Sequence, residues 1–193
     1  MTDPTIHIRP ATPSDAAILA ELINYAGEGL PLYLWEQMAE PGETVWDVGR
    51  RRALRDSGAF SYRNAVVAEQ DGKVVGGLVG YRLPDEEQEI TQDMPAMFVP
   101  LTELENLAPG TWYANVLAVI PQERGRGIGS ALLEKAVELA AATGTSDLSI
   151  IVSDANPGAR KLYERSGYKW KAERPMVKDG WKNPGKKWVL LVK

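Results

Sequence analysis

The chain has 193 residues, a formal net charge of −4 and no cysteine. This length fits one domain, and 44% apolar with 25% charged residues is usual for a globular protein. Without cysteine the chain has no disulfide, no thiolate nucleophile and no cysteine-based metal site, so we expect no metal. The acidic balance argues against nucleic acid as the main partner. The sequence has no run of about 18 apolar residues and no basic-then-apolar start, so we expect a cytoplasmic protein without a membrane partner.

Hydrophobic periodicity and turn residues predict a mixed α/β or α+β fold. Thr12 and Asp15 have the spacing of a capping box at the start of a helix. Asp71 and Gly72 are the strongest short signal for a hairpin turn. We expect a single domain with a central mixed sheet of about six to seven strands flanked by helices. In chain order the pattern predicts a strand at 5–9, a helix from Thr12 to about Gly27, two helices within 31–57, a hairpin within 62–83, a strand at 111–120, a helix ending at Gly144, a strand at 148–153, a helix after Asn156, and strands within 168–177 and 186–193.

Two segments invite further expectations. Residues 84–110 contain four prolines and no sustained period, which predicts a long loop inserted into the domain of residues 1–193. A loop of this length in a small domain is usually functional or mobile. The final strand, within 186–193, could lie at a sheet edge and pair across a homodimer.

A glycine-rich turn precedes the helix that ends at Gly144. Gly125, Gly127 and Gly129 follow a strand, and a helix N-terminus after such a turn can bind an anion. The nucleotide pattern G-x-x-x-x-G-K-[ST] is absent, and a dinucleotide loop would need a glycine where Ser130 stands. A turn that only allows tight packing is the remaining alternative. The expected apolar face of the helix comprises Ile128, Leu132, Leu133, Ala136, Val137 and Ala140.

A third phosphate-binding pattern, R-x-x-G-x-G, does match this turn. It is formed by Arg124, Gly127 and Gly129 in "LAVIPQERGRGIGSALL". This segment resembles the GNAT superfamily of N-acetyltransferases, in which the loop amides hold the pyrophosphate of coenzyme A. The resemblance implies acetyl-CoA as cosubstrate. The residues that it assigns to acetyl-CoA binding here are Leu117, Ala118, Val119, Arg124, Gly125, Arg126, Gly127, Ile128, Gly129 and Ser130.

A second segment, "SDANPGARKLYERSGYKW", is similar to a later motif of the same family. Asn156 and Tyr163 are seven residues apart, so they share a helix face. The resemblance implies that Asn156 binds a pantetheine amide. It assigns the role of general acid, which protonates the departing thiolate, to Tyr163, and a phenol with an ordinary pKa of about 10 can donate at neutral pH. In the alternative interpretation Asn156 only caps the helix and Tyr163 fills the core. The matching positions are Asn156, Ala159, Leu162, Tyr163, Gly167 and Tyr168.

The reaction implied is transfer of an acetyl group to a primary amine of a small molecule or peptide. Since no cysteine can carry the acetyl group, direct attack in a ternary complex is expected. The resemblance assigns stabilisation of the oxyanion to backbone N–H groups around Leu117 and Val119. Many family members carry a glutamate base where this chain has Asn115, which could instead position a water.

The general base therefore stays open. Glu103, Glu105 and the carboxylates of 85–89 lie in the 84–110 insertion, which could cover the acceptor site as a lid. A solvated charge is the favoured interpretation of each. Because the usual glutamate is missing, a non-catalytic acyl-CoA-binding or sensing module is the alternative function.

Overall fold

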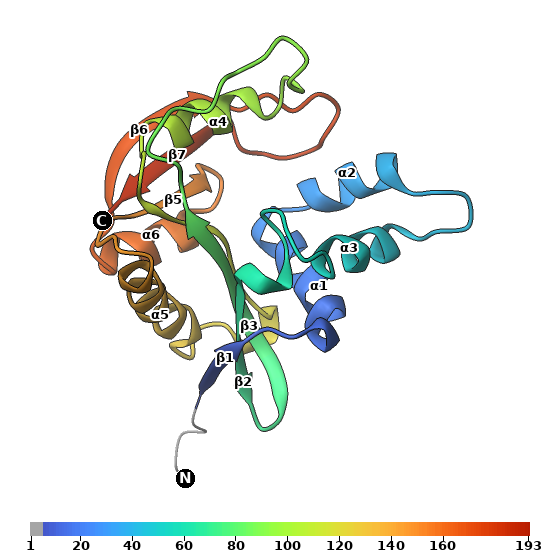
Figure 1. The fold of residues 1–193 in the computed structure, drawn as a ribbon, viewed down its shortest axis with the longest axis vertical. Coiled ribbons are helices and arrows are strands. Elements are labelled where there is room, and N and C mark those ends of the chain that lie inside the picture. Colours follow the sequence, from blue (N-terminus) through green and yellow to red (C-terminus); the bar gives the residue numbers. More distant parts are fainter. Residues whose placement is uncertain (1–5) are drawn as a thin grey trace. The chain divides into compact units, whose positions relative to one another are not determined.

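The strands of the chain follow the order β1-β2-β3-β4-β5-β7-β6 in a mixed sheet (Figure 1). The structure is a computed structural model that describes residues 6–193, and in this range it has seven strands and six α-helices. The chain divides into two compact units. Unit 1 comprises the chain up to Gly80 together with Asn115–Lys135, and unit 2 comprises Tyr81–Ala114 and Ala136–Lys193.

In unit 1 the first three strands form an antiparallel meander. β1 (His7–Pro10) pairs with β2 (Ala65–Gln70), which pairs with β3 (Lys73–Arg82). Asp71 and Gly72 join β2 to β3 with φ values of 51° and 72°. Two successive positive φ values define the hairpin turn whose twist matches the strands. The predicted hairpin is confirmed.

Three helices lie between β1 and β2 in the chain, as the periodicity predicts. The Asp15 carboxylate accepts the Thr12 N–H at 2.8 Å and is paired with Arg9, which also holds Glu69. The predicted capping box therefore forms, and Arg9 ties it to the strands; this pairing lowers the pKa of Asp15 to about 2. A glycine and a threonine open the next two helices. The three are α1 (Ala16–Ala26), α2 (Leu30–Met38) and α3 (Val45–Ala53).

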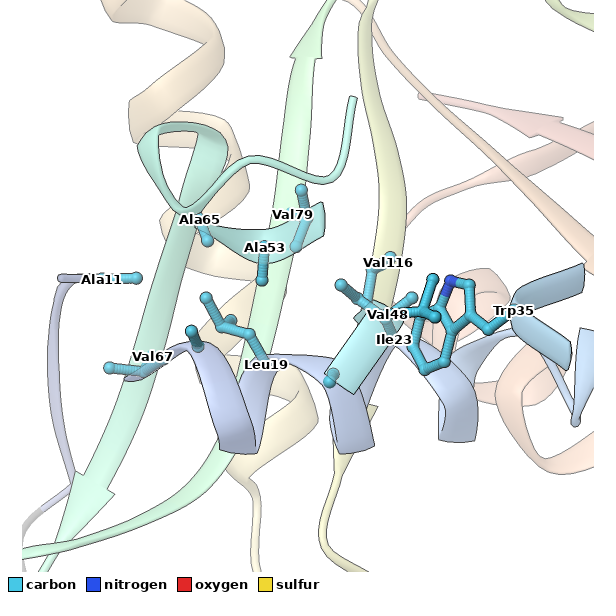
Figure 2. Close-up of a cluster of buried hydrophobic side chains, with 12 residues drawn as sticks. Ala11, Leu19, Ile23, Trp35, Val48, Ala53, Ala65, Val67, Val79 and Val116 are labelled. Carbon is cyan, nitrogen blue, oxygen red and sulfur yellow. The ribbon is translucent and has the colours of Figure 1, made fainter. Parts of the chain in front are cut away.

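The core of unit 1 lies between these helices and the strands (Figure 2). Leu19 and Ile23 from α1 meet Val48 from α3 and Val67 from β2, and the Trp35 indole closes one end. The four aliphatic side chains are almost completely removed from water. Each such burial contributes about 1.5–3 kcal/mol, so this cluster fixes the helices on the sheet.

In unit 2 the sheet is built around β7 (Lys187–Val192). β7 pairs antiparallel with both β5 (Leu148–Ser153) and β6 (Lys169–Pro175). Both edges of β7 are therefore occupied, and the expectation that it is an edge strand is wrong. The outer strand is β6, which follows a helix in the chain and folds back onto β7. The first residues of β4 (Trp112–Val119) pair in parallel with β5.

The 84–110 segment contains a helix, α4 (Val99–Asn106), where the sequence predicts only a loop. α4 packs against β6 and β7, with Leu104 fully buried, and the Glu103 carboxylate accepts the Arg174 Nε–H at 2.6 Å (Figure 1). The helix has only eight residues and Pro100 in its first turn. Two turns are too few for a clear helical period, so its existence depends on the strands that cover it.

The last two helices begin and end where the sequence indicates. α5 (Ile128–Ala142) is followed by Gly144 with a φ of 80°, and α6 (Pro157–Arg165) by Gly167 with a φ of 94°. Both glycines take the left-handed conformation that ends helices. One residue of the predicted apolar face of α5 is wrong: Val137 is 40% exposed, because the stripe of buried residues passes beside it.

Candidate functional site

The glycine loop, residues 124–129, leads from a short turn after β4 into α5. Gly125 and Gly127 have φ values of 78° and 81°, in the region that L side chains rarely adopt. A Cβ at either position would meet no atom within 4 Å among the described residues. These glycines are therefore required by the backbone conformation. Close packing does not require them, so a turn that only allows tight packing does not explain them.

The loop ends by presenting the first turn of α5. Ala131 N–H donates to the Gly127 carbonyl at 3.0 Å and closes that turn. The preceding N–H groups, of Ile128, Gly129 and Ser130, have no acceptor inside a helix by geometry. Together with the helix dipole they favour an anion at this end.

The two loop arginines are held by the loop itself. Arg124 Nε donates to the Val119 carbonyl at 3.2 Å, and Arg126 forms an ion pair with Glu123. Both contacts are exposed to solvent, where such a pair is worth about 0–1 kcal/mol. A phosphate could therefore compete for either guanidinium at little cost.

A further glycine, Gly76 on β3, brings α5 close to the strands of unit 1. A Cβ there would lie 3.0 Å from the Ala118 carbonyl oxygen and 3.1 Å from Ile128 Cγ2. Gly76 thus permits the first turn of α5 to approach the backbone of β4. Sequence reasoning missed this residue, because nothing in a strand pattern tells which glycine faces a helix.

The second half of β4 has two different faces. Val116 and Ala118 are buried, whereas Asn115, Leu117 and Val119 are half-buried and share the opposite face. Ile120 N–H pairs with the Val75 carbonyl at 2.9 Å. Asn115, Leu117 and Val119 are alternate residues of the strand, so their side chains point to the same face.

In unit 2 the start of α6 is organised by Asn156. Its Oδ1 accepts the Ala159 N–H at 3.1 Å, so Asn156 is the N-cap of the helix. Two turns later Tyr163 is buried, and its ring lies 6.1 Å from that of Tyr168. Both contacts fit the alternative in which Asn156 caps the helix and Tyr163 fills the core. The cap uses only the Asn156 side-chain oxygen, so the amide N–H₂ group can still donate to a ligand.

Tyr163 belongs to a group of four titratable side chains, Tyr81, Glu105, Tyr113 and Tyr163, which we call the tyrosine–glutamate cluster. The rings of Tyr81 and Tyr113 meet edge to face with centroids 6.0 Å apart. Burial raises the pKa of Tyr113 far above its ordinary value, and the charges of Glu105, Tyr81 and Tyr163 add to the shift. Burial raises the pKa of Glu105 to about 7. The Glu105 side chain is half-buried, so it is less exposed to solvent than the sequence predicts.

Most of this cluster is absent from the sequence motifs. Only Tyr163 belongs to one, and Glu105 stands in a segment without a helical period. Tyr81 and Tyr113 come from β3 and β4, so no spacing rule connects them. For Glu105 the sequence gives only a weak signal, namely an acidic residue three positions after Thr102. Within residues 6–193, no group of three or more histidine, cysteine or acidic side chains could hold a metal, and no helix has the length and apolar character to cross a membrane.

Comparison with known proteins identifies the family. The model of the acetyltransferase (GNAT) family matches residues 31–168, which is more than half of the chain. The chain belongs to this family.

Individual relatives agree. L-2,4-diaminobutyric acid acetyltransferase of Nocardia farcinica is 27% identical over 144 residues, 70% of this chain and 63% of that protein. This chain thus spans somewhat less than two thirds of that relative. Mycothiol acetyltransferase of Beutenbergia cavernae is 42% identical over a shorter stretch, 28% of this chain and 18% of the relative.

Solved structures share the fold over nearly the whole chain. A crystal structure described as an acetyltransferase has a TM-score of 0.66 and 25% identity, and the match covers 97% of this chain and 98% of that one. A GNAT family acetyltransferase from Elizabethkingia anophelis, solved with acetyl-CoA bound, has a TM-score of 0.57 and 19% identity over all of this chain and 98% of its own.

Proposed function

We propose that the protein transfers an acetyl group from acetyl-CoA to a primary amine of a small molecule or peptide, by direct attack in a ternary complex. The single observation that carries this proposal is the pair of left-handed glycines at the start of α5, inside the segment that matches the acetyltransferase family. The names of two relatives, for diaminobutyric acid and mycothiol, add support for acetyl transfer.

In unit 1, the glycine loop would hold the pyrophosphate of acetyl-CoA. The N–H groups of the first turn of α5 supply donors without acceptors, and the φ values of Gly125 and Gly127 let the backbone take the required path. Arg124 and Arg126, whose present contacts are exposed, would add charge. The backbone N–H groups of Leu117 and Val119, in the second half of β4, would stabilise the oxyanion.

In unit 2, Asn156 and Tyr163 would act on the pantetheine end. The cap uses only the carbonyl oxygen of Asn156, so its amide N–H₂ could donate to a pantetheine carbonyl. The Tyr163 hydroxyl would give its proton to the coenzyme A thiolate as the C–S bond breaks. Tyr163 is buried at the second turn of α6.

A non-catalytic acyl-CoA sensor is the second candidate, and Asn115 is the observation that favours it. Asn115 stands where many family members carry a basic carboxylate, and an amide does not accept a proton. In a catalytic protein Asn115 would instead position a water on the half-buried face of β4.

A panel of amines separates the two candidates. Amino acids including 2,4-diaminobutyric acid, polyamines, aminoglycosides and peptides are incubated with acetyl-CoA, and free thiol is measured. Acetyl-CoA at 100 times its dissociation constant should stabilise the fold by about 2.7 kcal/mol in either case. Release of thiol that depends on an amine supports the enzyme. Stabilisation without release of thiol by any amine supports the sensor. If acetyl-CoA neither stabilises the protein nor releases thiol, both candidates are contradicted.

A further inference from the structure

Trp188, the second residue of β7, carries a buried donor that the fold does not use. The residue is 9% exposed, and among residues 6–193 its indole Nε1–H has no hydrogen-bond partner. An indole N–H can only donate, so it needs an acceptor atom. A buried donor without an acceptor destabilises the folded protein, and its presence in a native structure therefore calls for a reason.

Strand pairing places a polar side chain on each side of Trp188. Its register partners are Ser153 in β5 and Arg174 in β6. Directly paired residues of antiparallel strands project their side chains to the same face of the sheet. Ser153 is buried, whereas the Arg174 side chain is 35% exposed. Ser153, Trp188 and Arg174 thus form a row, which we call the β7 row, from a buried hydroxyl to a guanidinium that solvent can reach.

The β7 row has two donors beside each other that can bind a further acceptor. Arg174 Nε donates to the Glu103 carboxylate at 2.6 Å, and Arg174 Nη1 donates to the Glu173 carbonyl at 3.0 Å. These contacts leave the Arg174 Nη2 group as a donor, next to the Trp188 N–H. Two neighbouring donors, one of them charged, match the two oxygens of a carboxylate.

The β7 row lies next to the start of α6. The Ser153 carbonyl accepts the Asn156 N–H at 3.0 Å, and the Ser153 hydroxyl accepts the Ala155 N–H at 3.1 Å. Asn156 is the residue to which the proposed function gives the pantetheine amide. Neighbouring strands are separated by about 4.8 Å. Trp188 is therefore one strand away from the proposed pantetheine site, and both belong to unit 2.

The ring that covers Trp188 belongs to the loop of residues 176–186. The Trp181 indole stacks on that of Trp188, with ring centroids 6.1 Å apart and planes at 7°. Only Trp181 and Gly185 are buried in this loop. A Cβ at Gly185 would lie 2.5 Å from Ser153 Oγ, so the end of the loop is closely packed on β5. A segment with so few buried residues opens at a low free-energy cost, and Trp181 is the part whose movement uncovers the Trp188 indole.

We propose that Trp188 and Arg174 bind a carboxylate of the acceptor, so that the substrate is an amine that also carries a carboxyl group. The Trp188 N–H donates to one carboxylate oxygen and Arg174 to the other, while Trp181 moves aside. The substrate carboxylate competes with Glu103 for the guanidinium, and that ion pair is half-exposed and therefore weak. This inference rests on the proposed function and names its substrate class.

The first test uses pairs of amines that differ in one carboxylate. The pairs are 2,4-diaminobutyric acid with 1,3-diaminopropane, lysine with 1,5-diaminopentane, and a dipeptide with its C-terminal amide. Release of thiol from acetyl-CoA gives kcat/KM for each amine. In the pair that reacts best, the carboxylate form should be preferred by about tenfold or more, because the other form leaves the donors unpaired. No such preference in any pair overturns this inference alone. No release with any amine overturns the proposed function as well.

The second test compares Trp188→Phe with Trp181→Phe, which removes the same part of the stacked partner. Trp188→Phe should lower kcat/KM by about tenfold for the carboxylate form and by less than about threefold for the other. Trp181→Phe should change both forms by the same factor. An unchanged preference in Trp188→Phe overturns the role of its N–H.

Stabilisation by acetyl-CoA, measured on both variants, shows that each is folded and binds the cosubstrate. Weaker acetyl-CoA binding by Trp188→Phe alone would assign the N–H to the cosubstrate and overturn the proposal. If Trp188→Phe does not fold, Arg174→Gln replaces it, and the same loss of preference is expected. A full preference in Arg174→Gln also contradicts a carboxylate bound at the β7 row.

Discussion

The glycine loop and the tyrosine–glutamate cluster are built on opposite principles. The loop is an exposed, contiguous stretch whose useful groups are backbone N–H donors, fixed by two left-handed glycines. The cluster is buried at Tyr113 and Tyr163 and half-buried at Tyr81 and Glu105, and its useful groups are side chains from β3, α4, β4 and α6. A loop of this type is sensitive to backbone geometry and tolerant of side-chain chemistry. For the cluster the opposite holds, and this contrast can be tested one region at a time.

The largest expected effect belongs to the cluster. Tyr163→Phe removes one hydroxyl and leaves the ring, so packing against Tyr168 should persist. If Tyr163 is the general acid, kcat should fall by about 100-fold or more, because the thiolate leaves without a proton. Thiol release under saturating acetyl-CoA measures this. Full turnover by the variant would remove Tyr163 from the chemistry and reduce the cluster to a structural group.

Stability as a function of pH tests the same cluster without a substrate. The pKa of Glu105 is raised from 4.5 to about 7, so the folded state binds the proton more tightly than the unfolded state. This contribution to stability is present below about pH 4.5 and is lost as the pH rises through about 7. Glu105→Gln should therefore be more stable than the unaltered protein at pH 8, by about 2 kcal/mol, and equal at pH 4.

Urea unfolding at the two pH values checks this. Glu103→Gln serves as the control, since it loses its pair with Arg174 and should gain nothing at either pH. A Glu105→Gln variant with the same stability as the unaltered protein at pH 8 would mean that the carboxylate is solvated.

For the loop, backbone geometry is the quantity to change. Gly127→Ala places a Cβ on a φ of 81°, which costs about 1–2 kcal/mol of stability. It should also weaken acetyl-CoA binding about tenfold by altering the path of the loop. Gly144→Ala is the matched control, with a φ of 80° and equally open surroundings at the other end of α5.

Both variants should lose similar stability, and only Gly127→Ala should lose affinity in a titration with acetyl-CoA. Equal affinities in the two variants would show that the loop backbone does not contact the cosubstrate.

The smallest expected effect separates two roles of one side chain. Asn156→Asp keeps the oxygen that caps α6 and removes the amide donor, so stability should be nearly unchanged. Acetyl-CoA affinity should fall about three- to fivefold if the amide binds pantetheine. Asn156→Ala should lose about 1 kcal/mol of stability as well. Unchanged affinity of the aspartate variant would leave Asn156 as a helix cap only.

The sequence predicts well those parts of the fold whose conformation depends only on neighbouring residues. The hairpin at Asp71 and Gly72, the end of α5 at Gly144 and the cap at Asn156 each depend on a few adjacent residues. α4 and the position of β7 between β5 and β6 depend on partners far away in the chain, and sequence patterns contain no such information. Glu105 combines both difficulties, since its helix is short and its burial comes from other elements.

Gly76 has a consequence for protein engineering. It stands outside the loop, yet a single methyl group there would press on the Ala118 carbonyl and the Ile128 side chain, and these neighbours would have to move by a few tenths of an ångström. Gly76→Ala therefore offers a remote adjustment of cosubstrate affinity in which every atom that could touch acetyl-CoA keeps its chemical identity.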